Sequence, residues 1–344
     1  MNHKVALGLS GGVDSAAAAL LLREQGYEVH GFWLDLGVGS PEKAERAAAQ
    51  LGIPFGVLDV KAQHEKLVRA PFAEEYCSGR TPNPCVVCNP TVKLPALLAA
   101  AETIGAAYIA TGHYARIEER RGRPCLRMAD ARKDQSYMLA RVGPEILGRL
   151  LLPLADRTKP EIRALAASVG LSAAAEPDSQ DICFIPGGDY GAWLEARGMG
   201  LPEGDFVDDG GKVLGRHRGA HRYTVGQRRG LGVSADSRLY VCAMDMDRNR
   251  VILGPEEKLM TNTLFIKEIC WGAMENPAVP FRCEVKPRSR PTLYPAEIAP
   301  AGDGLRIRFD APLRRIAPGQ LAVGYDREGF VLFAGTVYSG QPET

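Results

Sequence analysis

The first third of the chain alternates between strand-like and helical segments, and this alternation limits the fold most strongly. Apolar runs at residues 4–9, 28–35, 55–60 and 106–111 predict β-strands. Helices are predicted at residues 14–25, 41–51, 92–103, 133–142 and 159–169. Strands that alternate with helices of about ten residues form a parallel sheet with helices on both faces. We therefore expect an α/β domain at the start of the chain.

The pattern changes after about residue 195. Residues 201–254 contain many glycines, short extended runs and turn signals such as Asp209-Gly210. From residue 261 onward, strand-like runs such as TLFIKEICW and GFVLFAGTVY are separated by Pro, Gly and Asp turns, which favours a small antiparallel barrel. We expect three domains: a parallel-sheet α/β domain at 1–196, a small glycine-rich mixed domain at 197–258, and an antiparallel β-barrel at 259–344.

A glycine-rich loop joins the first strand to the first helix. It comprises Gly8, Leu9, Ser10, Gly11, Gly12, Val13, Asp14 and Ser15. Adjacent glycines allow a tight turn that brings backbone N–H groups against a phosphate, and the helix N-terminus adds its positive dipole. Asp14 is placed to hold Mg²⁺ beside the phosphates. The alternative is a plain turn in which Ser10 or Asp14 caps the helix, but ligands bind at this end of α/β strands, which favours a nucleotide site.

The composition excludes several classes of protein. Eight cysteines in 344 residues do not make a disulfide scaffold. No uninterrupted apolar stretch approaches the ~18 residues of a membrane helix, and the N-terminus lacks a signal-peptide pattern. We therefore expect a cytoplasmic protein with no membrane partner. Because the net charge is only +1, a nucleic-acid surface requires local clusters of basic residues.

Three cysteines lie where sulfur chemistry is expected. Cys85 and Cys88 form a CxxC pair in a proline-stiffened loop, and Cys183 follows a polar stretch. In a reducing compartment, such a pair indicates redox, metal-binding or sulfur-transfer chemistry. Four others lie in strand-like runs and are interpreted as small buried hydrophobic residues: Cys125, Cys242, Cys270 and Cys283.

The S-G-G-x-D-S pattern of the loop is similar to that of the PP-loop ATP pyrophosphatases, which cleave ATP between its α and β phosphates. Six further motifs extend the resemblance nearly end to end: GRTPNPCVVCN, ATGHYAR, KDQSYML, DSQDICF, TVGQRRGLG and APGQ. With them, the chain resembles the tRNA-specific 2-thiouridylases, the MnmA/TrmU family. The resemblance implies ATP-dependent 2-thiolation of the wobble uridine, U34, of tRNA, with release of AMP and pyrophosphate.

The resemblance also implies roles for individual residues. Cys88 is the nucleophile, and Cys183 receives sulfur as a persulfide. Gly8 to Ser15 contact ATP together with Leu34 and Gly112, while Asn83, Pro84 and Cys85 border the target base. Contacts with tRNA are implied for His113, Lys133, Asp134, Gln135, Arg288, Ser289 and Gln320. The sulfur comes from a donor protein, either a cysteine desulfurase or a sulfur-relay protein.

One departure from the family pattern concerns the mechanism. Position 85, often acidic in the family, is Cys85 here. Cys85, Cys88 and Cys183 offer three thiolates, which would leave one iron of a [4Fe–4S] cluster open to the transferred sulfur. Persulfide relay and cluster chemistry both stay open at this point, and a tetrahedral zinc site also suits CxxC.

Basic residues gather in two segments. Residues 210–232 carry six Lys or Arg and no acidic residue, and residues 282–315 carry eight against four acidic residues. In a nearly neutral protein, such clustering fits a phosphate-binding face for tRNA. Three rival interpretations remain: ammonia-dependent amidation, thiolation of another tRNA base, and a catalytically idle tRNA-binding protein. Amidation would leave the three cysteines without a task.

Overall fold

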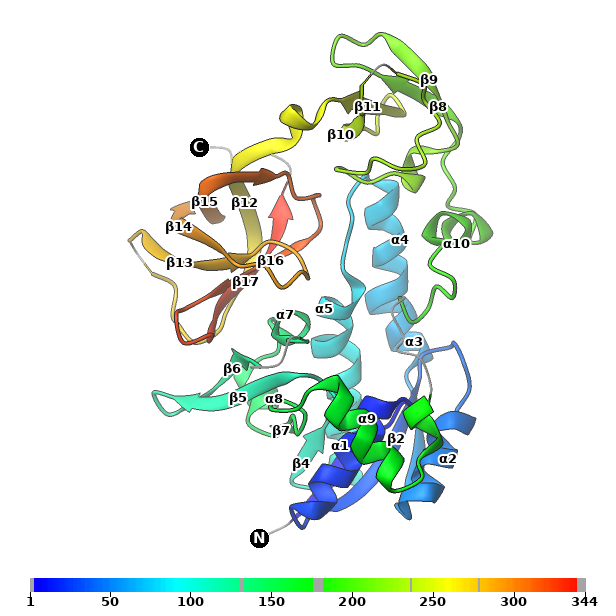
Figure 1. Ribbon diagram of the computed structural model, residues 1–344, viewed down its shortest axis with the longest axis vertical. Helices are drawn as coiled ribbons and strands as arrows, with labels where there is room; N and C mark the ends of the chain where they lie inside the picture. Colours follow the sequence, from blue (N-terminus) through cyan, green and yellow to red (C-terminus); the bar gives the residue numbers. More distant parts are fainter. Residues whose placement is uncertain (1–2, 130–132, 176–181, 236, 278, 339–344) are drawn as a thin grey trace.

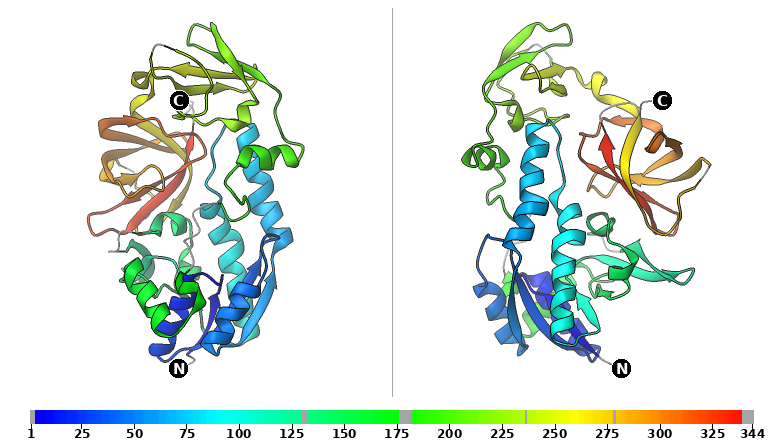
Figure 2. Two further views of the ribbon diagram at one scale, coloured as in Figure 1. Left: turned by 45° about the vertical axis from the view of Figure 1, so that its right-hand side comes forward. Right: turned by 180° about the vertical axis from the view of Figure 1, so that it is seen from behind.

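The computed structural model describes residues 3–129, 133–175, 182–235, 237–277 and 279–338. Figure 1 shows a helix-covered sheet at the N-terminal end, a small sheet at the opposite end, and a barrel beside them. Helix α4 (Ala70–Cys77) extends from the first part toward the small sheet, as both views in Figure 2 show. The predicted α/β, mixed and β-barrel parts are confirmed. The domain boundaries after residues 196 and 258 stay a prediction.

A five-stranded parallel sheet forms the centre of the first part, in the order β3-β2-β1-β4-β7. Its strands are β1 (Lys4–Gly8), β2 (Glu28–Asp35), β3 (Phe55–Asp59), β4 (Tyr108–Ala110) and β7 (Leu150–Leu151). Val5 and Leu7 belong to one apolar cluster and Ala6 to another, as expected for a strand buried on both faces. The chain reverses its direction across the sheet between β1 and β4, where ligands bind in such folds.

Helices cover both faces of this sheet. The cluster with Leu7 includes residues of α1 (Val13–Glu24), α2 (Glu42–Leu51), α9 (Lys159–Ser168) and η3 (Ser172–Ala175). The cluster with Ala6 includes residues of α6 (Leu94–Thr103), α7 (Ser136–Leu139) and α8 (Pro144–Leu147). Residues 16–19 of α1 are four fully buried alanines, which lets neighbouring elements approach this helix closely.

Two longer helices each contain a π-helical segment. One consists of α3 (Lys61–His64), η1 (Glu65–Arg69) and α4, and the other of α5 (Pro84–Cys88), η2 (Asn89–Lys93) and α6. Such wide turns are frequent at functional sites. Within the described residues, Pro84–Thr103 is the one helix long and apolar enough to cross a membrane. Half of it is buried in the protein, as in a core helix.

The remaining strands form two separate sheets. After α10 (Tyr190–Ala196), four strands form a mixed sheet in the order β10-β11-β8-β9. They are β8 (Gly204–Val207), β9 (Val213–His217), β10 (Tyr240–Asp245) and β11 (Arg250–Gly254). Two short 3₁₀ turns, η4 (Ala220–Arg222) and η5 (Glu256–Leu259), lie in the same part of the chain. The closed antiparallel barrel contains β12 (Met260–Trp271), β13 (Phe281–Lys286), β14 (Tyr294–Ala301), β15 (Gly304–Arg314), β16 (Leu321–Tyr325) and β17 (Val331–Tyr338). A hairpin of the first part, β5 (Ala115–Arg120) and β6 (Arg123–Met128), reaches the barrel, where Arg127 and Phe330 form a bridge.

A buried ion pair joins the barrel to the first part. The Lys286 ammonium of β13 lies 2.6 Å from Asp134 Oδ2, with the two side chains 5% and 11% exposed. Asp134 also accepts the backbone N–H groups of Ala129 and Ser136, each at 3.1 Å, and the Ser136 hydroxyl at 2.9 Å. Because Asp134 folds onto these groups, the helix predicted at residues 133–142 is shorter and begins at Ser136.

Candidate functional site

The predicted phosphate loop is a closed hydrogen-bonded turn. Ser15 Oγ accepts the Ser10 N–H at 3.2 Å and donates to the Gly12 carbonyl at 3.0 Å. The Gly12 N–H donates to the Ser10 hydroxyl at 3.3 Å. Gly11 has a φ of +81°, and a Cβ there would lie 2.6 Å from the backbone carbon of Lys43. The loop therefore needs glycine at position 11 for both conformation and space.

Neighbouring strand ends bring the other predicted ATP contacts to the same edge of the sheet. Gly8 pairs with Phe32 of β2, so Leu34 lies two residues further toward the carboxyl end of that strand. Gly112 follows β4, and a Cβ there would lie 2.8 Å from the backbone carbon of Asp14. Gly112 thus packs directly against the start of α1. Contact of these residues with ATP stays a prediction.

Asp14 is held in place by two donors. Its Oδ1 accepts the Tyr114 hydroxyl and the Lys159 ammonium, both at 2.7 Å. Within the described part of the chain, Oδ2 accepts no hydrogen bond, so one carboxylate oxygen is available to a cation. Mg²⁺ is usually bound by one or two carboxylates together with phosphate oxygens. The loop and Asp14 therefore fit a magnesium-bound nucleotide.

The CxxC pair lies at the start of a helix. Asn83 caps α5, because its Oδ1 accepts the Cys85 N–H at 3.1 Å. Cys85 and Cys88 are three residues apart and share one side of this helix. Cys88 is only 3% exposed and packs in an apolar cluster with Phe184, the neighbour of Cys183. Cys183 itself is exposed.

The three thiols and Lys93 form one electrostatic group. Burial raises the pKa of Cys88 to about 11; the Lys93 ammonium opposes this rise, and Cys183 and Cys85 add to it. Burial also raises the pKa of Cys85, again against Lys93. Burial lowers the pKa of Lys93, but the three thiols outweigh burial and raise it above its ordinary value. Such effects require short separations, so the structure brings the three predicted cysteines together. Lys93 was not among the site residues predicted from the sequence.

His113 connects this thiol group with the phosphate loop. It follows β4, and its Nδ1 lies 2.8 Å from the Thr111 hydroxyl. Burial lowers the pKa of His113 to about 4; Lys93 lowers it further, and Asp14 opposes the change. The imidazole is therefore neutral at physiological pH and close enough to both Asp14 and Lys93 to respond to their charges. The nucleotide end and the thiol end belong to one site.

The cysteines do not form a ready metal centre. All eight are described as free thiols. Among the residues with described positions, no group of three or more His, Cys, Asp or Glu side chains is arranged to hold a metal ion. Cys85, Cys88 and Cys183 are therefore not arranged as the ligands of a single metal ion such as zinc, and a [4Fe–4S] cluster on these thiols stays a prediction.

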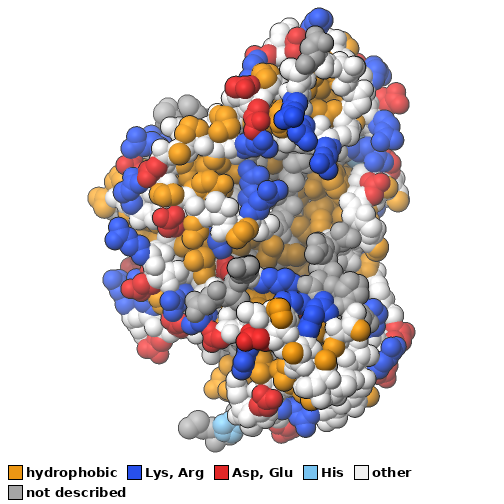
Figure 3. Space-filling view, in the orientation of Figure 1, with side chains coloured by type: hydrophobic (Ala, Val, Ile, Leu, Met, Phe, Trp, Pro, Cys, Tyr) orange, Lys and Arg blue, Asp and Glu red, His pale blue; other side chains and the backbone are white. Residues whose placement is uncertain are grey.

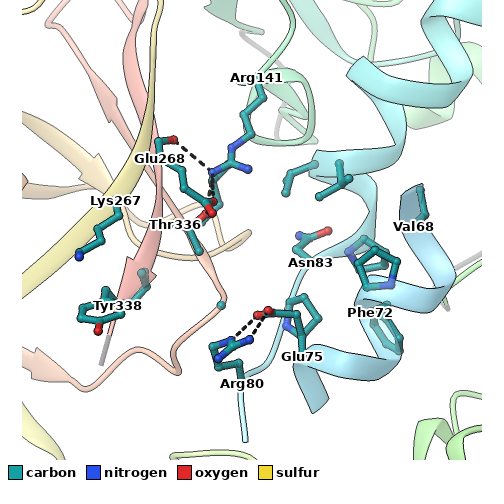
Figure 4. Close-up of a pocket in the computed structure, with 18 of the residues that line it drawn as sticks. Val68, Phe72, Glu75, Arg80, Asn83, Arg141, Lys267, Glu268, Thr336 and Tyr338 are labelled. Carbon is teal, nitrogen blue, oxygen red and sulfur yellow. Dashed lines mark hydrogen bonds and ion pairs between the residues drawn. The ribbon is translucent and has the colours of Figure 1, made fainter. Parts of the chain in front are cut away.

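An interdomain cavity of about 600 Å³ adjoins the thiol helix (Figure 4). Its helical side includes Val68, Phe72 and Asn83, and in Figure 4 these residues lie on the helices opposite the barrel strands. Across the cavity, Arg141 donates to the Thr336 hydroxyl at 2.6 Å. Among the described residues, no cysteine lines the cavity. Val68 and Phe72 belong to the cluster that buries Cys88. The cavity thus borders the apolar cluster that buries Cys88.

The residues predicted to contact tRNA have different environments. Three of these side chains bind other parts of the protein. Asp134 forms the ion pair at the barrel interface, and the Gln135 side-chain oxygen accepts the Tyr114 N–H at 3.0 Å. The Gln320 side-chain amide donates to the Thr81 carbonyl at 2.6 Å. Lys133 and Ser289 are exposed, and Arg288 is half-buried. Burial lowers the pKa of Arg288, and Arg290 adds to this effect. Their contact with tRNA stays a prediction.

The basic segment at residues 210–232 is only partly available to a ligand. Arg222 pairs with Glu195 at 2.6 Å, and Arg216 pairs with Asp205 at 3.1 Å. The cations that are exposed and have no ion pair among the described residues are Lys212, Arg218, Arg228 and Arg229. Figure 3 shows Lys and Arg side chains around the hollow in the centre of this face. This distribution fits a concave surface that binds phosphates.

The burial of Cys88 predicts selective alkylation. At pH 7.5, iodoacetamide should modify Cys183 at least tenfold faster than Cys88, because Cys183 is exposed and the Cys88 thiol, with a pKa of about 11, is protonated. Cys88 should become reactive only as the pH approaches 11. Peptide mass spectrometry after timed alkylation measures both rates. Equal rates at pH 7.5 would contradict this account of the site.

Three family models match successive parts of the chain: the tRNA methyl transferase HUP domain at residues 3–187, its PRC-barrel domain at 195–255, and the aminomethyltransferase beta-barrel domain at 261–337. The fold and the phosphate loop thus define a tRNA-modifying enzyme of the HUP class. Curated relatives named tRNA-specific 2-thiouridylase MnmA cover nearly the whole chain. The protein of Roseiflexus castenholzii is 42% identical, over 96% of this chain and 98% of its own length.

Two more relatives with the same name agree. The protein of Acidithiobacillus ferrooxidans is 44% identical over 95% of this chain and 96% of its own length. The protein of Clostridium acetobutylicum is 38% identical over 95% of this chain and 97% of its own length. The chain belongs to the family of tRNA-specific 2-thiouridylases. The family resemblance found in the sequence motifs is therefore confirmed.

Proposed function

We propose that this protein uses ATP to replace the C2 oxygen of the wobble uridine, U34, of tRNA with sulfur. The main support is that Gly112 packs against Asp14 of the phosphate loop, while the next residue, His113, and the three thiols all respond to the charge of Lys93. The family models are described by methyl transfer and the curated relatives by thiolation. A loop for nucleotide phosphates beside thiols favours thiolation, since sulfur transfer requires both an activated oxygen and a sulfur carrier.

The first step is adenylation of the uridine. The C2 oxygen attacks the α phosphate of ATP, the α–β bond breaks, and pyrophosphate leaves. The backbone N–H groups of residues 8–15 and the N-terminus of α1 bind the phosphates, and Mg²⁺ at Asp14 would neutralise part of their charge. Neutral His113, which follows Gly112 at this end of the site, orients the base by hydrogen bonding. AMP is a far better leaving group than the original oxygen.

The second step transfers sulfur from Cys183. A donor protein, a cysteine desulfurase or a sulfur-relay protein, loads exposed Cys183 as a persulfide. Its terminal sulfur attacks C2. The Cys88 thiol, which is protonated at rest, loses its proton as it attacks Cys183 Sγ. The S–S bond breaks, AMP leaves with the old oxygen, and a Cys88–Cys183 disulfide forms. The two thiols are oxidised as the transferred sulfur is reduced, and an external thiol reductant resets the pair. Cys85, with Asn83 and Pro84, borders the base.

The exposed basic residues provide the tRNA-binding surface, in the cytoplasm where the substrate occurs. Replacing both Arg228 and Arg229 with Ala should weaken tRNA binding about tenfold at low salt and reduce the salt slope by one to two, because each lost phosphate contact reduces counterion release. Filter binding at several salt concentrations measures this. Arg248→Ala is the control, since Arg248 pairs with Asp245 in the same small domain. If the double variant and the control bound tRNA with the same affinity and salt slope, Arg228 and Arg229 would not belong to the tRNA-binding surface.

Nucleoside analysis tests the proposed function. The enzyme is incubated with ATP, a persulfide donor and unmodified tRNA, and the tRNA is digested and analysed by mass spectrometry. We expect 2-thiouridine at position 34, with one AMP and one pyrophosphate per sulfur. Thiolation of another base would show that the assignment of U34 as the substrate is wrong. A methylated nucleoside would show that the assignment of sulfur transfer as the reaction is wrong.

A further inference from the structure

The phosphate loop lacks a cationic side chain of its own. Residues 8–15 contain no Lys or Arg. Backbone N–H groups and a helix dipole provide only partial charges, whereas the triphosphate of ATP carries several negative charges. Asp14, within the loop, adds a further negative charge. Mg²⁺ at Asp14 would offset only part of this charge, so a cationic side chain from elsewhere in the fold is expected beside the phosphates and Asp14.

Lys159 is placed to provide that charge. It is the first residue of α9, far from the loop in sequence, yet its ammonium lies 2.7 Å from Asp14 Oδ1. The Lys159 side chain is 15% exposed and that of Asp14 is 33% exposed, so the pair lies at the mouth of the loop and remains accessible to a ligand. Tyr114 holds the same oxygen at 2.7 Å, which fixes the carboxylate to which Lys159 points.

The surrounding structure fixes the start of α9. Thr158 and Glu161 form a capping box, in which the Thr158 N–H donates to Glu161 Oε2 at 2.6 Å. Ile162 and Ala166 are fully buried in the cluster that contains α1. The helix that carries Lys159 and the helix that carries Asp14 are therefore packed as one unit. A lysine held this way loses less conformational entropy when it binds a phosphate than one on a mobile loop would.

We propose that Lys159 is the phosphate-binding cation of this site. In the ATP-free protein, its ammonium pairs with Asp14. When ATP binds, the ammonium would leave Asp14 Oδ1 for phosphate oxygens next to the α–β bond, and Asp14, still held by Tyr114, would offer Oδ2 to Mg²⁺. As this bond breaks, the ammonium stabilises the charge that develops on the leaving pyrophosphate. The inference rests on the proposed ATP cleavage and deepens it by naming the residue that supplies the charge.

Two variants and two measurements test this inference. Lys159→Met keeps the length and apolar stem of the side chain but removes its charge, and Lys159→Arg keeps the charge. Affinity is measured by calorimetry with α,β-methylene-ATP, which cannot be cleaved at the relevant bond. The rate of tRNA-dependent pyrophosphate release is measured at saturating ATP. We expect Lys159→Met to bind the analogue about tenfold more weakly and to release pyrophosphate at least 100-fold more slowly. Lys159→Arg should restore most of the affinity.

Controls separate this role from a structural one. Lys66→Met removes an exposed lysine of the same domain and should change neither measurement. If Lys159→Met lowers the thermal midpoint but leaves affinity and release unchanged, Lys159 only supports Asp14 and the inference is overturned. The binding measurement needs no tRNA. If Lys159→Met weakened binding of the analogue but the wild-type enzyme made no 2-thiouridine, the proposed function would be wrong and the role of Lys159 would stand.

Discussion

Replacing Cys183 with Ser should abolish formation of 2-thiouridine, with a loss of roughly a thousandfold or more. Serine cannot carry a persulfide, so no activated sulfur reaches the uridine. Adenylation needs no thiol, and tRNA-dependent release of pyrophosphate should therefore continue in a single turnover. Cys183 is exposed, so this substitution should not destabilise the fold. Nucleoside analysis and pyrophosphate release, measured on the same sample, separate the two steps.

Cys77→Ser is the matched control for that experiment. Cys77 belongs to the same domain, and its thiol donates to the Met199 carbonyl at 3.3 Å, a contact that a serine hydroxyl can replace. We expect full thiolation by this variant. If Cys183→Ser retained thiolation at the wild-type rate, sulfur would reach U34 without a persulfide on this residue, and the relay would be wrong.

Replacing Asp134 with Ala should lower the free energy of unfolding by about 3–5 kcal/mol. The substitution leaves the Lys286 ammonium, only 5% exposed, without its carboxylate in a buried interface. It also removes the acceptor for two backbone N–H groups, those of Ala129 and Ser136. Denaturant unfolding followed by circular dichroism measures the change. This large effect distinguishes an interface residue from a residue whose main task is to contact tRNA.

Asp310→Ala provides the comparison. Arg282 and Asp310 form an ion pair between barrel strands, but their side chains are 58% and 50% exposed. Solvent screens such a pair, so its loss should cost less than about 1 kcal/mol. A double variant, Asp134→Leu with Lys286→Met, should recover much of the stability lost in Asp134→Ala, because no charge is then left buried. If Asp134→Ala were no less stable than Asp310→Ala, the buried pair would not hold the barrel in place.

The periodic elements of the sheet domain were predictable from sequence. The strand at 28–35 is correct to the residue, and β1, β3, α1, α2 and α9 agree within one or two residues. These segments have clear apolar patterns with glycine or proline at their ends. The strand β14 and helix α4 were not predicted. β14 contains two prolines in YPAEIAPA, and α4 contains Pro71, which hid a helix that is continuous with the preceding π segment.

The candidate site was predictable in its motifs but not in its electrostatics. Cys85, Cys88 and Cys183 were singled out from the sequence, and they interact in the structure. Lys93 and Lys159 were missed, because each is an ordinary lysine of a helix until the fold brings it to its partner. The π segment that ends at Lys93 has no clear sequence signal. Part of the DSQDICF motif, residues 178–181, lies outside the described residues.

One measurement tests the central claim most directly: the redox state of Cys88 and Cys183 after a single turnover. The enzyme, loaded with a Cys183 persulfide, is mixed with ATP and unmodified tRNA without reductant, and peptides and nucleosides are analysed together. We expect one Cys88–Cys183 disulfide for each 2-thiouridine formed, and neither product without ATP. Formation of 2-thiouridine while both cysteines remain reduced would contradict the account.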